Sequence, residues 1–114
     1  MELTISPTAD GLTIRLEEGR LDSASAVVFK DAVREAATAG PAVIVLDMQE
    51  VEFLDSSGLG AVVGAMKALA PGTRLELARL QPAVARVFTL THMDRVFTIH
   101  DTLPEPADGL GRTG

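Results

Sequence analysis

The sequence predicts a single α/β domain, in which a mixed sheet of about five strands carries its helices mainly on one face. Short segments with the alternating or continuous apolar pattern of strands are separated by longer segments with apolar residues at helical spacing. A chain of 114 residues is long enough for one hydrophobic core and too short for two. We therefore expect residues 1–101 to form the domain. Residues 102–114 contain two prolines and three glycines and are expected to form a mobile tail.

The N-terminal part of the chain predicts a hairpin followed by a helix. Residues 3–5 and 12–16 alternate apolar with polar side chains, as half-buried strands do, and Asp10-Gly11 marks a turn between them. Asp22 or Ser23 can cap a helix that runs to about residue 39, where Gly40-Pro41 stops it.

The rest of the chain alternates strands and helices. Residues 42–46 are apolar throughout, which is typical of a central strand. Beyond them, the pattern predicts a helix up to residue 69, a strand over 74–78, a helix that Gln81-Pro82 opens, and a last strand over 96–100.

Composition and charge exclude several classes of function. The net charge of −6 argues against nucleic acid or an anionic membrane surface as a partner, because both require a cationic face. The absence of cysteine excludes disulfides and thiolate ligands, and we expect no metal site. We see no secretion signal, and the most apolar segment, residues 59–70, is too short to span a bilayer. The expected location is therefore the cytoplasm, without direct insertion into a membrane.

The most informative segment is the run Asp55-Ser56-Ser57-Gly58-Leu59-Gly60, which follows the apolar strand at the point where a helix begins. Two hydroxyls beside the free N–H groups of a helix N-terminus suit the installation and recognition of a phosphate. We expect Ser57 to cap the helix and Ser56 to lie one step outside it, with its hydroxyl in solvent. If both serines act only as caps, they contribute about 1 kcal/mol to stability.

The small residues of this helix allow two interpretations. They can leave a flat docking surface beside the serines, or they can permit close packing against a neighbouring element; the residues concerned are Gly58, Gly60, Ala61, Gly64 and Ala68. A phosphate-binding P-loop is excluded because Gly64 is followed by Ala65 rather than by Lys and Ser or Thr. A dinucleotide fingerprint fits poorly, because the glycines do not directly follow the strand. We expect no metal site at His92 or His100, and we interpret both as structural.

The Asp-Ser-Ser-Gly-Leu-Gly run resembles the signature of the STAS family, the anti-sigma factor antagonists of bacteria. A second block, Gly19-Arg20-Leu21-Asp22, is similar to that family's turn before the first helix. The resemblance extends from the first strand to about His100 and implies the same fold. Family members usually end with a further helix, but Pro104 and Pro106 oppose a full-length version of it. The resemblance also implies that the turns holding Asp22 and Asp55 lie close together and frame the serine.

This resemblance implies a partner-switching function and assigns Ser56 as the residue that is phosphorylated. The expected partner-binding residues are Asp22, Asp55, Ser57, Gly58, Leu59 and Gly60. The unphosphorylated form would bind an anti-sigma factor that is also a serine kinase of the histidine-kinase-like ATPase fold, and thereby release that kinase's client. ATP and Mg²⁺ would belong to the kinase, and a serine phosphatase of the PP2C class would remove the phosphate. The chain itself would have no cofactor and no enzymatic activity.

A second interpretation comes from a different class of protein. STAS domains also serve as small, non-switching subunits of lipid-transport ABC complexes, and the serine motif alone does not separate the two functions. An enzyme is the least favoured class, because the sequence offers no convincing pair of nucleophile and base.

Overall fold

The computed structural model of the protein describes residues 1–107. Its main sheet has five strands in the order β1-β2-β4-β6-β7. β1 (Leu3–Pro7) runs antiparallel to β2 (Gly11–Leu16), as the predicted hairpin requires. β4 (Val43–Asp47), β6 (Arg74–Ala78) and β7 (Ile99–His100) follow in parallel pairings. The predicted mixed sheet is confirmed.

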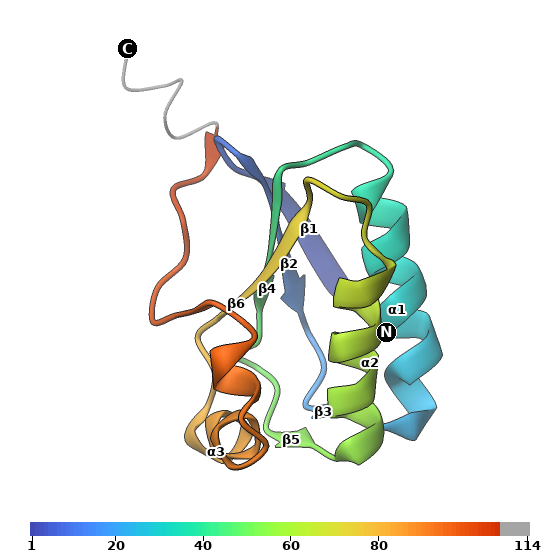
Figure 1. Cartoon of the computed structure of the whole chain (residues 1–114), viewed down its shortest axis with the longest axis vertical. Coiled ribbons are helices and arrows are strands. Elements are labelled where there is room, and N and C mark those ends of the chain that lie inside the picture. Colours follow the sequence, from blue (N-terminus) through green and yellow to red (C-terminus); the bar gives the residue numbers. More distant parts are fainter. Residues whose placement is uncertain (108–114) are drawn as a thin grey trace.

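The helices α1 (Ser23–Ala37) and α2 (Ser56–Ala68) pack side by side on one face of this sheet (Figure 1). Alternate residues of the three central strands point toward them, because the side chains of a strand alternate between the two faces. These residues form the centre of the core and are almost fully buried: Leu12, Ile14, Ile44, Leu46, Leu75 and Leu77. Phe29 and Val33 of α1 and Val62 of α2 pack against them.

The third helix, α3 (Pro82–Leu90), lies at one end of the sheet, near the start of α2 (Figure 1). Pro82 occupies its first turn, as predicted, since a helix does not need that N–H group. A 3₁₀ turn, η1 (Met93–Arg95), follows. Phe97 then enters the core and packs edge-to-face on Phe88, with ring centroids 5.9 Å apart. This turn and the burial of Phe97 shorten the expected strand over 96–100 to the two residues of β7.

Two very short strands, which the sequence did not predict, form a second sheet. β3 (Arg20–Leu21) precedes α1, β5 (Phe53–Leu54) precedes α2, and the two pair in parallel. Figure 1 shows β5 beside the start of α2 and close to α3. This small sheet joins the segments that lead into the two helices.

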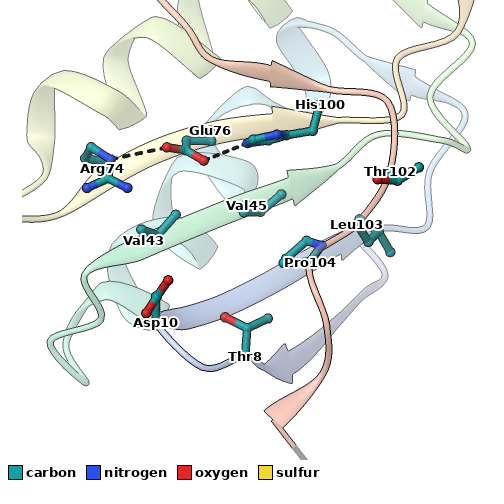
Figure 2. A pocket seen from close by; sticks show the side chains of 10 residues that line it. All are labelled: Thr8, Asp10, Val43, Val45, Arg74, Glu76, His100, Thr102, Leu103 and Pro104. Atoms are coloured by element: carbon teal, nitrogen blue, oxygen red, sulfur yellow. Dashed lines mark hydrogen bonds and ion pairs between the residues drawn. The ribbon is translucent and has the colours of Figure 1, made fainter. Parts of the chain in front are cut away.

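After β7 the chain crosses the face of the main sheet that α1 and α2 leave open (Figures 1 and 2). Pro106 forms an isolated antiparallel bridge with Thr8 at the end of this crossing. The expected boundary between the domain and a mobile tail stays a prediction. Most of that tail, residues 108–114, and any further C-terminal helix lie outside the described residues.

Candidate functional site

The pairing of β3 with β5 brings the two sequence blocks together. Arg20 lies opposite Phe53 and Leu21 lies opposite Leu54, so that Asp22 and Asp55 follow side by side. Both aspartates have extended backbone, and each is the N-cap of the helix that it precedes. The two turns are therefore adjacent, as the resemblance implied. We call this region, formed by residues 20–22 and 53–57, the serine end of the domain.

Asp55 caps α2, whereas the sequence prediction assigned this cap to Ser57. The Asp55 Oδ1 atom accepts a hydrogen bond of 2.9 Å from the Gly58 N–H, and the helix begins at Ser56. The prediction was wrong because aspartate and serine are equally good caps, and only the point where the helix starts decides between them. Ser56 and Ser57 thus occupy the first helical positions. Both are exposed, and within residues 1–107 neither hydroxyl forms a hydrogen bond.

Asp22 caps α1, as predicted, and does so through a reciprocal capping box. Its Oδ1 atom accepts hydrogen bonds from the Ala24 N–H at 3.1 Å and the Ser25 hydroxyl at 3.3 Å. The Ser25 hydroxyl oxygen in turn accepts from the Asp22 N–H at 3.1 Å. Burial raises the pKa of the Asp22 carboxyl, but hydrogen bonds from Arg20, Ser25 and Ala24 outweigh this effect and lower the pKa below its ordinary value. The serine end therefore carries the ionised Asp22 carboxylate at neutral pH.

Arg20 and Phe53 belong to the serine end, although neither was predicted as a site residue. The Arg20 guanidinium lies 4.2 Å above the centroid of the Phe53 ring, and its Nε atom donates to Asp22 Oδ2 at 3.3 Å. Phe53 is 40% exposed, whereas its neighbour Leu54 is buried. The one feature of the sequence that could have indicated Arg20 as a site residue is its position inside the Gly-Arg-Leu-Asp block.

Gly58 is a packing residue. Of the two interpretations that the sequence left open for the small residues, it supports close packing at the start of α2. A Cβ atom at Gly58 would lie 2.0 Å from the carbonyl oxygen of Leu21, so the first turn of α2 packs directly on β3. Gly60 has open space around it and is exposed. Leu59 is half-buried against the core. Ala61 is buried, contrary to the prediction that it would contribute to an outer surface.

A cavity of about 280 Å³ lies on the opposite side of the main sheet, between the strands and residues 102–104 (Figure 2). Glu76 projects into it and accepts hydrogen bonds from His100 Nε2 at 2.8 Å and Arg74 Nε at 3.2 Å. No residue of the serine end lines this cavity. It is therefore not part of the candidate site.

We expect replacement of Glu76 by glutamine to destabilise the protein by about 1 kcal/mol at pH 7. Burial raises the pKa of the Glu76 carboxyl, but hydrogen bonds from His100 and Arg74 outweigh this effect and lower the pKa from its ordinary value of 4.5. The stability that its ionised form contributes is complete above pH 4.5 and is lost as the pH falls through the lower folded-state pKa. Urea unfolding of both proteins between pH 7 and pH 2.5 measures this loss, and the difference should shrink in acid. Glu35→Gln, at an exposed position on α1, is the control, and a difference for Glu76→Gln that does not change with pH would contradict the expectation.

Within residues 1–107, no three His, Asp or Glu side chains gather closely enough to hold a metal ion. No helix in the same range is long and apolar enough to cross a membrane.

The fold and the serine end together define an α/β domain of one known family. The family model for the STAS domain matches residues 2–105, and the chain therefore belongs to the STAS domain family. A STAS-domain protein of Pseudomonas aeruginosa is 32% identical over 103 residues, which cover 87% of this chain and 99% of that protein. The anti-sigma-B factor antagonist of Listeria monocytogenes is 32% identical over 82 residues, covering 71% and 72% of the two chains.

A solved structure shows the same fold. The anti-sigma factor antagonist SpoIIAA of Bacillus, in its unphosphorylated form, superposes with a TM-score of 0.70 at 25% identity. The superposition covers 89% of this chain and 89% of that protein. The predicted STAS resemblance and α/β fold class are confirmed.

Proposed function

We propose that this protein is an anti-sigma factor antagonist, and that phosphorylation of Ser56 switches its binding to an anti-sigma factor. The observation that carries the proposal is the state of Ser56 itself. Ser56 is exposed at the first position of α2, its hydroxyl forms no hydrogen bond within residues 1–107, and Asp55 already provides the cap. A kinase can therefore modify Ser56 without removing a contact that the domain needs. The names of the Listeria relative and of SpoIIAA support the general role.

A phosphate on Ser56 should leave the fold intact and act on a bound partner. It adds about −1.5 to −2 charges at neutral pH. The dipole of α2 favours a negative charge at this position by about 0.3–1 kcal/mol, so the domain tolerates it. In a docked interface the same group would be desolvated beside Asp22 and Asp55, at a cost of several kcal/mol. Binding is therefore strong without the phosphate and weak with it.

The proposed partner is an anti-sigma factor that is also a serine kinase of the histidine-kinase-like ATPase fold. Its ATP and Mg²⁺ supply the phosphoryl group, and a PP2C-type phosphatase restores the free serine. On this proposal the chain is a substrate and a binding module in the cytoplasm, without a cofactor or an enzymatic activity of its own. The docking surface includes the exposed positions Ser57 and Gly60 beside Ser56.

The proposal is tested by affinity capture from the lysate of the native cell, with each captured protein identified by mass spectrometry. The baits are wild type, Ser56→Ala and Ser56→Asp. We expect wild type and Ser56→Ala to capture a kinase-type ATPase, and Ser56→Asp to lose it, because the added carboxylate imitates part of the phosphate charge.

The matched control is Ser6→Asp, which adds the same charge at an exposed serine on β1, and it should retain the kinase. Equal capture of the kinase by Ser56→Ala and Ser56→Asp would overturn the switch. Equal capture of ABC-transporter subunits by all baits would establish the non-switching transport subunit in its place.

A further inference from the structure

The serine end carries one cation, Arg20, which lies beside Asp22 on the outward face of β3. Leu21 and Leu54 are buried and point into the core, so their neighbours Arg20 and Phe53 point outward. The extended backbone of Asp22 and Asp55 continues this alternation, which places the two carboxylates on the outward face together with Arg20. Ser56 follows Asp55 directly.

The guanidinium of Arg20 is held in place but is not saturated. The Phe53 ring supports it at 4.2 Å, and its Nε atom donates to Asp22 Oδ2 at 3.3 Å. Its terminal Nη groups form no hydrogen bond within residues 1–107, and the side chain is 64% exposed. A guanidinium presents a planar set of N–H donors that matches the oxygen spacing of a phosphate. Arg20 therefore retains the donors that bidentate phosphate binding requires.

Arg20 can leave Asp22 without disrupting α1. The capping hydrogen bonds from Ala24 and Ser25 go to the Oδ1 atom of Asp22, whereas Arg20 contacts Oδ2. Transfer of the guanidinium to another anion thus leaves the capping box complete. A phosphate with almost two negative charges competes well against a single carboxylate.

We propose that Arg20 binds the phosphoryl group of phosphorylated Ser56, and exchanges its contact with Asp22 for the phosphate oxygens. This inference rests on the proposed function, because it takes Ser56 as the modified residue. The unphosphorylated state pairs Arg20 with Asp22 and leaves the Ser56 hydroxyl in solvent. The phosphorylated state redirects Arg20 across the outward face of β3 and β5. Phosphorylation therefore changes the position of one arginine as well as the charge of one serine.

The second pKa of the phosphate is the direct test, because the acidic surroundings and Arg20 act on it with opposite sign. Glu18 and Asp22 line the same hollow as Arg20, and Asp55 lies on the neighbouring turn. These carboxylates raise the pKa of the phosphate, whereas a contacting guanidinium lowers it. Phosphoserine is installed at position 56 by genetic code expansion, and its ³¹P shift is titrated between pH 4 and pH 8.

We expect Arg20→Gln to raise the second pKa of the phosphate by about half a unit relative to wild type. Arg34→Gln is the matched control, since it removes the same charge and a similar exposed contact to an aspartate, on α1 and away from the serine end. It should leave the titration unchanged. In Arg20→Lys the second pKa of the phosphate should lie between the values of wild type and Arg20→Gln, because lysine keeps the charge but not the planar donors.

Identical titrations for wild type, Arg20→Gln and Arg34→Gln would overturn the contact between Arg20 and the phosphate. That result would leave the proposed switch intact, because the phosphoserine is introduced without a kinase and the capture experiment measures partner binding separately. Conversely, a capture experiment that shows no difference between Ser56→Ala and Ser56→Asp would overturn the switch without affecting the titration. Circular dichroism of the Arg20 variants verifies that they fold.

Discussion

Gly58→Ala is expected to destabilise the protein by about 3 kcal/mol or more, although alanine is the better helix former. The added Cβ atom would lie 2.0 Å from the carbonyl oxygen of Leu21 and 2.7 Å from the carbonyl carbon of the same residue. Both atoms belong to backbone, which cannot move aside as the end of a flexible side chain can. Relief of the clash requires α2 to separate from β3. This separation would also move the turn at Asp55 away from the turn at Asp22.

The neighbouring glycine provides the control, with an effect of opposite sign. Gly60 lies in the same helix but has nothing within 4 Å of an added Cβ atom. Gly60→Ala should therefore stabilise the protein by about 0.5–1 kcal/mol through the lower flexibility of the unfolded chain. Urea unfolding followed by circular dichroism measures both variants. A loss of less than about 1 kcal/mol for Gly58→Ala would show that the start of α2 is not packed on β3 as described.

The longer helices and strands of the fold could be predicted because each one carries its own hydrophobic pattern. The apolar run of β4 and the helical spacing of α2 are properties of contiguous residues. β3 and β5 could not be predicted, because a strand of two residues has no measurable periodicity. They form only because Leu21 and Leu54 are drawn into the same core from distant parts of the chain.

The family resemblance predicted the adjacent turns at Asp22 and Asp55, but not the side-chain contacts around them. Ser56 follows from the motif through the family resemblance, and its assignment as the phosphorylated residue stays a prediction. Asp55 as the cap depended on the first helical residue, which sequence patterns locate least well. The stacking of Arg20 on Phe53 arises from a strand pairing between segments that are far apart in the sequence. Such a contact leaves no local signal.

Arg79→Met is the second variant with a large expected effect, and it should destabilise the protein by about 3–4 kcal/mol. Asp47 is completely buried at the end of β4, and the Arg79 Nε and Nη2 atoms donate to its two carboxylate oxygens at 3.1 and 2.6 Å. The hydrogen bond to Asp47 raises the pKa of the Arg79 guanidinium, although burial opposes it. Without Arg79, the only hydrogen bond that the buried carboxylate retains within residues 1–107 is the one from the Gln49 N–H at 3.2 Å. The backbone of residue 79 has a φ of 58°, but this constraint is the same for methionine as for arginine.

A double variant separates the lost charge pair from lost packing. Asp47→Asn combined with Arg79→Met removes the uncompensated buried charge, so we expect it to be more stable than Arg79→Met alone by about 1–2 kcal/mol. Arg74→Gln is the control for an exposed pair, since Arg74 is 67% exposed and contacts Glu76 by a single bond, and it should cost less than about 1 kcal/mol. Chemical unfolding of wild type, Asp47→Asn, Arg79→Met and the double variant gives the interaction energy as a double-mutant cycle. If the two substitutions instead add to a larger loss, the stability comes from the packing of the arginine stem, and the charge pair contributes little.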